Sequence, residues 1–220
     1  MTTGVLTQLV DRAILSESDD LQERKYIGAS SIGSLCERAI WYRYNGHVPE
    51  ALPAKQKRNF SIGKRLEGLV LDCIEQAGVK IARTWYDLKD AEIELFQGHI
   101  DAMWLAEDGS AKAILEVKTA RDSSFNIFVN RGLKHWNPTY YSQIQSYMGM
   151  SGVHEAYLIA LNKDTSDLHD ERILFNAPFY EQLKRRCQRI LDATEAPERI
   201  NRNPMYFTCR GCQFKGACHS

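Results

Sequence analysis

Alternating apolar and polar positions in the middle of the chain predict a β-hairpin. Residues 94–105 are mostly extended in character, Asp108 and Gly109 form a two-residue turn signal, and 112–119 supply the return strand. A dipeptide of this kind between two strand-like runs is typical of a tight hairpin turn. The other inferences depend on this hairpin.

Counting outward from the turn pairs Asp101 with Glu116 across the two strands. Directly opposed side chains have Cβ atoms about 5 Å apart, and alternation along the strand puts Lys118 on the same face as Glu116. Two opposed carboxylates repel each other, and a divalent cation between them removes the repulsion. A surface strand with alternating charges would look the same. The functional interpretation is a hard-metal site for phosphodiester hydrolysis.

Apolar spacings of three and four residues predict helices around the hairpin. The clearest helix is 61–77, ended by Gly78. Its predicted apolar stripe is Ile62, Leu66, Leu69, Val70, Cys73 and Ile74. Glu67 borders this stripe, so it is either a solvated carboxylate or a third carboxylate leaning over the hairpin. Gly63, one turn earlier, would permit a close approach of the strand or of a ligand.

A second informative helix begins at Asn137, with Pro138 in its first turn. Tyr140, Gln143 and Tyr147 share one face of it. An aromatic stripe is most simply part of the core, but a buried amide needs hydrogen-bond partners. Gln143 is therefore a candidate for the functional site.

The remaining segments complete the expected organisation. We expect helices at 3–15 and 179–191, a helix capped by Ser30 or Ser31, loops at 16–25, 49–57 and 121–136, and a buried strand at 156–161. The helix 179–191 has a basic outer face, which is either solvated or attractive to a phosphate backbone. Its basic residues are Lys184, Arg185, Arg186 and Arg189.

Composition limits the class of protein. The chain has 220 residues, of which 44% are hydrophobic and 25% charged, as expected for one good core. Lys and Arg total 28, and Asp and Glu also total 28, so any contact with DNA must come from a local basic patch. No secretory signal and no apolar run of membrane-spanning length is visible. We therefore expect a cytoplasmic protein whose six cysteines are not disulfides.

Three cysteines near the C-terminus, Cys209, Cys212 and Cys218, have the spacing C-x2-C-x5-C. Short loops of this kind bring several thiolates to one metal or cluster. The spacing alone favours zinc. A fourth ligand is required, and the candidates are His219, Cys36, Cys73 and Cys187. Taken alone, Cys36 is most simply a small core residue on the helix that Ser30 or Ser31 is expected to cap.

Five short motifs in one order resemble the RecB-like branch of the PD-(D/E)XK nuclease superfamily. They are Gly63-x3-Glu67, Gly98-x2-Asp101, Glu116-Val117-Lys118, Gln143-x3-Tyr147 and the cysteine pattern with one N-terminal member. The resemblance covers about residues 28–218. It is closest to the iron–sulfur members of the superfamily, namely CRISPR-associated exonucleases, the AddB nuclease domain and phage recombination exonucleases.

This resemblance implies a 4Fe–4S cluster on Cys36, Cys209, Cys212 and Cys218, and it leaves Cys73 and Cys187 as core residues of their helices. It also implies Mg²⁺ or Mn²⁺ held by Glu67, Asp101, Glu116 and the Val117 carbonyl, with Lys118, Gln143 and Tyr147 completing the catalytic set. Tyr140 and Lys134 are weaker candidates for positioning nucleic acid. Many relatives have His where this chain has Glu67, and an all-oxygen site favours Mg²⁺.

We therefore expect an α/β fold with a mixed central β-sheet flanked by helices and an iron–sulfur staple joining the N-terminal helix to the C-terminal tail. The expected domain is 1–220, with an N-terminal helical part (1–60), a nuclease core (61–200) and a cluster loop (201–220). The expected function is a metal-dependent DNA exonuclease acting 5′→3′ on single-stranded ends, with no membrane association. Its partners would be recombination or CRISPR adaptation proteins, in bacterial, archaeal or phage-infected host cytoplasm. The alternative is a non-catalytic DNA-binding or adaptor module stabilised by zinc or a cluster.

Overall fold

The structure is a computed structural model that describes residues 4–16, 25–83 and 87–220. The expected loop at 16–25 lies mostly outside these residues. The strands are β1 (Ile27–Gly28), β2 (Ile81–Ala82), β3 (Asp87–Lys89), β4 (Phe96–His99), β5 (Ala102–Leu105), β6 (Ala111–Ala120), β7 (Glu155–Asn162) and β8 (Leu168–Leu174). The helices are α1 (Val5–Ser16), α2 (Ala29–Ile32), α3 (Glu37–Tyr44), α4 (Ala54–Gln76), α5 (Asp122–Arg131), α6 (Leu133–Trp136), α7 (Pro138–Ser151), α8 (Ala177–Asp192) and α9 (Lys215–His219).

A five-stranded mixed sheet forms the centre, in the order β2-β5-β6-β7-β8, and a smaller sheet has the order β1-β4-β3. In the larger sheet β6 and β7 pair in parallel, and the other neighbours are antiparallel. Parallel pairing requires a long crossover, which α5, α6 and α7 supply between β6 and β7. The predicted strand 156–161 is β7. The predicted α/β fold with a mixed central sheet flanked by helices is confirmed.

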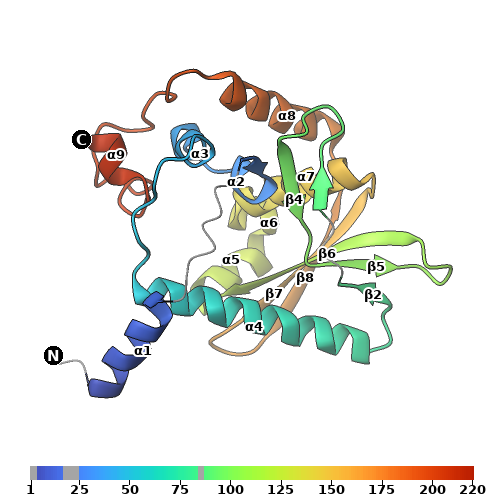
Figure 1. The fold of residues 1–220 in the computed structure, drawn as a ribbon. Helices are drawn as coiled ribbons and strands as arrows, with labels where there is room; N and C mark the ends of the chain where they lie inside the picture. The colour runs from blue at the N-terminus through green and yellow to red at the C-terminus, as the bar shows by residue number, and fades with distance from the viewer. Residues whose placement is uncertain (1–3, 17–24, 84–86) are drawn as a thin grey trace.

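Helices cover both faces of the central sheet (Figure 1). α4 packs on one face, where Val70 contacts the cluster that contains Val117 of β6. α5 and α7 pack on the other face, and Ile144 of α7 belongs to the larger core there. Because side chains alternate along β6, Glu116 and Lys118 face α7 rather than α4.

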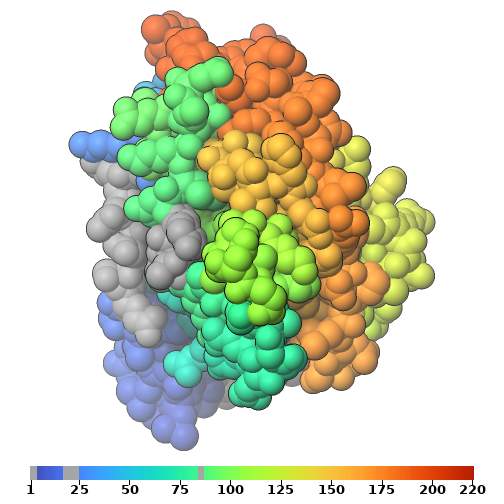
Figure 2. Space-filling model, turned by 90° about the vertical axis from the view of Figure 1, so that its right-hand side faces the viewer, coloured from blue at the N-terminus to red at the C-terminus, as the bar shows by residue number. Residues whose placement is uncertain are grey.

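The predicted hairpin forms, but its turn is longer than expected. The Ala106 N–H donates to the Ser110 carbonyl at 2.9 Å, and the Gly109 N–H donates to the Ala106 carbonyl at 3.0 Å. The loop therefore contains three residues, 107–109, instead of two. Gly109 has a φ of 83°, which glycine adopts without the steric cost that a side chain adds. In Figure 2 this yellow-green tip stands near the middle of the molecular face, beside the teal end of α4.

A β-bulge beside the turn restores the predicted register. Leu105 pairs with Ala111, but Trp104 pairs with Ala113, so one extra residue is inserted into β6. The extra residue in the turn and the extra residue in β6 shift the register in opposite senses and cancel. Ala102 therefore pairs with Leu115, which leaves Asp101 opposite Glu116 as predicted.

The first strand of the hairpin is not continuous. β4 ends at His99 and belongs to the smaller sheet, whereas β5 begins at Ala102 in the larger one. Ile100 and Asp101 lie at this break between the sheets. Asp101 therefore projects from a strand end, where backbone groups and side chains from several elements meet.

Segment 28–42 forms two short helices instead of the one predicted. α2 has Gly28 as its N-cap and is followed by Gly33, where a Cβ would lie 2.6 Å from the Cβ of Ser142 on α7. The close packing of α2 on α7 explains why the chain requires glycine and turns here. As a result Cys36 is the N-cap of α3 and is only partly buried, so its simple interpretation as a core residue is wrong.

The predicted helix 61–77 begins earlier, at Ala54, so the loop expected at 49–57 is shorter. Leu66, Val70 and Ile74 pack toward the sheet as predicted. Other members of the predicted stripe are exposed, and these are Ile62, Leu69 and Cys73. The expectation that Cys73 is a core residue is therefore wrong, whereas Cys187 on α8 is fully buried as expected.

The expected loop at 121–136 is helical. It forms α5 and α6, separated by Gly132 with a φ of 73°. The helices predicted at 3–15, from Asn137 and at 179–191 are confirmed as α1, α7 and α8. No described helix combines the length and apolar character needed to pass through a lipid bilayer.

Candidate active site

Glu116 lies in the middle of β6 with 1% of its surface exposed. Its Oε1 atom accepts hydrogen bonds from Lys118 Nζ and from Gln143 Nε2, the latter at 2.9 Å. Its Oε2 atom is buried and has no hydrogen-bond partner among the described residues. A buried carboxylate oxygen without a donor is costly, so this atom is free to bind a cation.

Asp101 lies beside Glu116 and is anchored to its strand. Asp101 Oδ2 accepts a hydrogen bond from the Val117 N–H at 2.8 Å. Burial raises the pKa of Asp101, and burial also raises the pKa of Glu116 to about 8, with the negative charge of Asp101 adding to the effect. Burial by itself lowers the pKa of Lys118, but the charges of Glu116 and Asp101 raise it above its ordinary value. Burial is thus the main reason that the pKa values of both carboxyl groups are raised, and the charge of Lys118 offsets it only in part.

A third carboxylate, Glu67 on α4, lies near enough for the charges of Asp101 and Lys118 to act on it. Glu67 is partly buried, and burial followed by the negative charge of Asp101 raises its pKa. Lys118 lowers that pKa, which shows that its charge also reaches Glu67. The expected close approach at Gly63 is not observed, because an added Cβ would lie 3.6 Å from Thr119 Oγ1, an ordinary contact.

The predicted polar face of α7 points into the site. Gln143 is 6% exposed, and its Nε2 donates to Glu116 and, at 2.6 Å, to Tyr147 Oη. The Tyr147 ring packs on Gly98, where an added Cβ would lie 2.5 Å from the ring carbon Cε1. Both halves of the Gly98-x2-Asp101 motif therefore have a physical role, with the glycine admitting the tyrosine ring.

The two weaker candidates are placed differently. Lys118 Nζ lies 5.0 Å from the centre of the Tyr140 ring, so Tyr140 borders the site. Lys134 is exposed, and its Nζ lies over the Tyr141 ring instead.

The basic face of α8 is largely neutralised. Lys184 is buried rather than outward-facing and pairs with Glu92 at 2.8 Å. Arg186 and Arg189 both contact Glu37, at 3.1 and 2.7 Å. Most of this positive charge is thus used within the fold.

Sequence reasoning missed a polar network beside the site. His99 Nδ1 lies 2.8 Å from Asp87 Oδ1, and its Nε2 lies 3.3 Å from Tyr26 Oη. Both Tyr26 and His99 line a pocket that also includes Tyr147. The available signal was the position of His99 directly after Gly98 in the motif.

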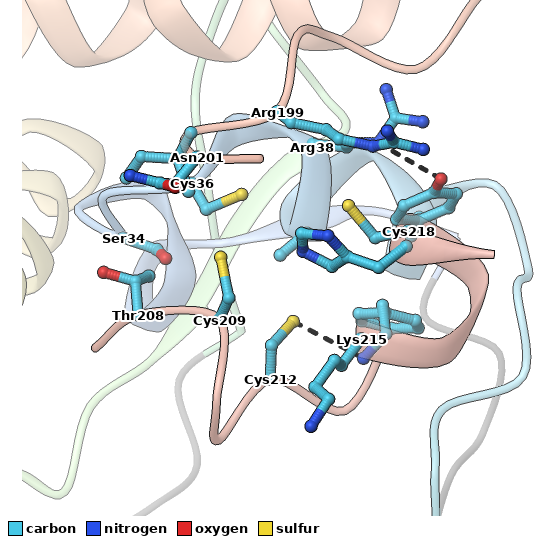
Figure 3. A pocket seen from close by; sticks show the side chains of 15 residues that line it. Ser34, Cys36, Arg38, Arg199, Asn201, Thr208, Cys209, Cys212, Lys215 and Cys218 are labelled. Carbon is cyan, nitrogen blue, oxygen red and sulfur yellow. Dashed lines mark hydrogen bonds between the residues drawn. The ribbon is translucent and has the colours of Figure 1, made fainter. Parts of the chain in front are cut away.

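A second constellation lies at the other end of the molecule. Cys36, Cys209, Cys212 and Cys218 line one pocket of about 170 Å³, and their sulfur atoms point toward the same hollow in Figure 3. Burial raises the pKa of Cys209 and of Cys212, and the neighbouring thiols add to both effects. Cys73 and Cys187 do not line this pocket.

Protein contacts hold the C-terminal tail beside α3. The Gly216 N–H donates to Glu50 Oε1 at 2.7 Å, Arg43 donates to Gln213 Oε1 at 2.9 Å, and the Phe214 ring stacks on Tyr42 with centres 5.8 Å apart. Cys36 is thus brought near the tail by contacts that do not involve any thiol.

Neither constellation is a closed metal site. Within the described ranges 4–16, 25–83 and 87–220, no three His, Cys, Asp or Glu side chains stand close enough together to hold a metal ion. The carboxylates nevertheless suit a hard divalent cation, because Glu116 Oε2 is buried without a hydrogen-bond partner among the described residues and the negative charge of Asp101 acts on Glu116.

Comparisons with known proteins agree with this architecture. The model of the YqaJ-like viral recombinase domain matches residues 21–154, which is more than half of the chain. No curated protein sequence matches. Among solved structures, the alkaline exonuclease LHK-Exo from Laribacter hongkongensis has 14% identity and a TM-score of 0.59, covering 84% of this chain and 90% of that chain. A structure of the same exonuclease in complex with dAMP gives 14% identity and a TM-score of 0.60, with coverages of 78% and 88%.

The structure of SSO0001 is also similar, with 17% identity and a TM-score of 0.60, covering 99% of this chain and 98% of that chain. At these identities the structural likeness establishes the fold, and the family match establishes the relationship. The chain belongs to the YqaJ-like viral recombinase family and has the PD-(D/E)XK fold of phage-type exonucleases.

Proposed function

We propose that this protein is a divalent-metal-dependent DNA exonuclease that degrades single-stranded ends in the 5′→3′ direction. The observation that carries the proposal is the buried Glu116 carboxylate, with one oxygen held by Lys118 and Gln143 and the other unpaired. The family match supports DNA as the substrate and viral recombination as the context. Strand preference and polarity rest on the sequence resemblance.

Glu67, Asp101, Glu116 and the Val117 carbonyl would hold Mg²⁺ or Mn²⁺. A cation bound there would polarise the scissile phosphate and lower the pKa of a water molecule. Lys118 would orient the attacking water and stabilise the negative charge that develops on the phosphate. Gln143 fixes the Glu116 carboxylate, and Tyr147 fixes Gln143, so both hold the site in one arrangement.

The second part of the proposal is a structural 4Fe–4S cluster on Cys36, Cys209, Cys212 and Cys218. The supporting observation is that these four cysteines line one pocket. The choice of a 4Fe–4S cluster over zinc rests on the resemblance to the iron–sulfur members of the superfamily.

A digestion assay with purified protein tests the proposal. Single- and double-stranded DNA labelled at the 5′ or 3′ end is incubated with Mg²⁺, with Mn²⁺ or with a chelator. Shortening of single strands from the 5′ end only with metal is the expected result. A colourless, zinc-containing protein that binds DNA without cleaving it would instead support the adaptor module.

Glu67→Ala is expected to weaken metal activation, and Glu67→His is expected to shift the optimum from Mg²⁺ toward Mn²⁺. The physical reason is that imidazole is a softer ligand than carboxylate. Metal titrations of the cleavage rate provide the measurement, and Glu75→Ala on the exposed side of α4 is the matched control. Superimposable titrations for all three variants and the native protein would show that Glu67 is only a helix surface residue.

Without divalent metal, the protein is expected to lose stability as the pH rises. Burial raises the pKa of Glu116 from 4.5 to about 8, so the folded state retains a proton that the unfolded chain has released. This contribution is fully present below pH 4.5 and is lost as the pH rises through about 8. Thermal melts in chelator should show a fall in Tm of several degrees between pH 5 and 8.5, which Mg²⁺ reverses and Glu116→Gln reduces. Equal Tm values across this range would contradict the assignment.

A further inference from the structure

A pocket of about 200 Å³ adjoins the candidate active site on the side of the smaller sheet. Its walls include the side chains of Tyr26, Gln97, His99 and Tyr147, together with Gly28 and Gly98. A water molecule occupies roughly 30 Å³ in the liquid, so the pocket has room for more than a few solvent molecules. The proposed function assigns no role to this space.

The chemistry of the walls indicates what the pocket binds. Among the residues that the structure describes, no Lys or Arg lines it, and such side chains are the cationic donors that recognise phosphate. Three rings line it, and Gly28 and Gly98 contribute backbone rather than side chains to its walls. Flat aromatic nucleobases stack on such rings, and amide or hydroxyl groups reach their edges.

One wall is held in place by its own hydrogen-bond network. Asp87 lies 2.8 Å from His99 Nδ1, and Tyr26 Oη lies 3.3 Å from His99 Nε2. The Tyr26 and His99 rings meet edge-to-face, with centres 6.5 Å apart and an angle of 72° between them. A surface built in this way from β1, β3 and β4 is arranged before any ligand arrives, which lowers the cost of ordering on binding.

Tyr147 joins the pocket to the catalytic carboxylate. Its ring lines the pocket, and its Oη accepts from Gln143 Nε2 at 2.6 Å, while the same nitrogen holds Glu116. The pocket and the candidate active site therefore share one side chain, Tyr147.

We propose that this pocket, lined by Tyr26, His99 and Tyr147, binds the nucleobase of a nucleotide adjacent to the scissile phosphate. The inference rests on the proposed nuclease function. Tyr26 and His99 are then positioning residues that hold the DNA strand, and they take no part in the bond cleavage itself.

An abasic scan tests this in the native protein. Single-stranded oligonucleotides carry one tetrahydrofuran abasic site at successive positions around the first bonds cleaved. The expected result is a drop in kcat/KM of about tenfold at one position, because base stacking on an aromatic ring is lost there. Equal rates for all positions would overturn the pocket proposal while leaving the exonuclease function intact.

Substitutions in the pocket test whether the loss of rate at the abasic position arises there. Tyr26→Ala and His99→Ala should lower kcat/KM about tenfold on ordinary DNA and should remove the dependence on the abasic position. Tyr26→Phe keeps the ring and should retain the dependence, and His135→Ala on the exposed part of α6 is the matched control. Persistence of the position dependence in folded Tyr26→Ala and His99→Ala would also contradict the proposal.

Measurements of DNA affinity test the pocket independently of the proposed nuclease activity. Fluorescence anisotropy in Ca²⁺ measures the affinity of the native protein for the same oligonucleotides without requiring cleavage. A weaker affinity at one abasic position supports the pocket even if the protein does not cut DNA. Equal affinities at every position, in a protein that does not cleave, would overturn both proposals.

Discussion

Glu116→Gln, Asp101→Asn and Lys118→Ala are each expected to lower the rate of DNA cleavage by about 10³-fold or more. Glu116 and Asp101 supply negative charge at one point between β5, β6 and α7, and Lys118 is the cation in contact with that charge. Glu116→Gln and Asp101→Asn each remove one charge and keep the shape of the side chain, whereas Lys118→Ala removes the charge by shortening the side chain. The loss should therefore appear in kcat rather than in the affinity for DNA.

The fold of the two carboxylate variants is expected to survive. Burial raises the pKa of both Glu116 and Asp101, so the folded protein without metal already disfavours their ionised forms. Removing one ionised group relieves this cost, and the Tm of the metal-free variants should equal or exceed that of the native protein. Lys118→Ala is the exception, since it leaves Glu116 without its cation.

Cleavage rates with saturating Mg²⁺, DNA affinity in Ca²⁺ and thermal melts together provide the measurement. Glu107→Gln is the matched control, because Glu107 is an exposed carboxylate at the tip of the same hairpin. Native cleavage rates in an Asp101→Asn or Glu116→Gln sample free of contaminating nuclease would exclude the proposed mechanism.

The position of Asp101 was predicted correctly from the sequence, although the turn that sets it was not. The turn signal and alternation predicted the pairing with Glu116, but the prediction assumed a two-residue turn. The structure has a three-residue loop and a compensating bulge between Trp104 and Leu105. A bulge depends on packing with neighbouring strands, and Lys112 next to it lies 3.7 Å from the centre of the Trp104 ring. Sequence alternation contains no trace of such a bulge.

The face of α7 was predictable for a different reason. Asn137 accepts hydrogen bonds from the Thr139 and Tyr140 N–H groups, as an N-cap should, and this fixes the phase of the helix. Once the phase is known, Gln143 and Tyr147 must lie on one side. The partners of Gln143 required the long-range contact with β6, which no local pattern indicates.

The segment 121–136 was not predictable as helix by the same criteria. Phe125 and Phe128 are buried, but Ile127 and Val129 between and after them are exposed, so the apolar spacing is mixed. Tertiary contacts decide the outcome, since Phe128 stacks on Trp136 at 4.7 Å between ring centres. Tertiary contacts also explain why Cys73 is exposed, because only the side of α4 that carries Val70 and Ile74 packs on the sheet.

Cys36→Ser is expected to lose the iron and to lower the Tm, whereas Cys73→Ser keeps both. Cys36 lines the pocket with the three tail cysteines, and Cys73 is exposed on α4. A cluster that links residues 36 and 209 closes a loop of 209 − 36 = 173 residues. By analogy with a disulfide, such closure contributes roughly 5 kcal/mol at most.

The observed loss should be smaller than this limit. Glu50, Arg43 and Tyr42 already hold the tail through hydrogen bonds and ring stacking, so the loop is partly closed without the cluster. Iron content therefore reports whether the cluster is bound, whereas Tm reports the stability of the whole fold. Cys187→Ser provides the third case, because Cys187 is fully buried on α8 and outside the pocket. It should lower the Tm through poorer packing while retaining full iron.

Iron analysis, the visible absorption spectrum and thermal melts of the three variants decide the assignment. The decisive comparison is between Cys36→Ser and Cys187→Ser, since both are expected to be less stable and only the first to be colourless. If Cys36→Ser retained full iron while Cys187→Ser lost it, Cys36 would be no ligand. The pocket beside α3 would then be a thiol-lined hollow held together by the contacts of Glu50, Arg43 and Phe214.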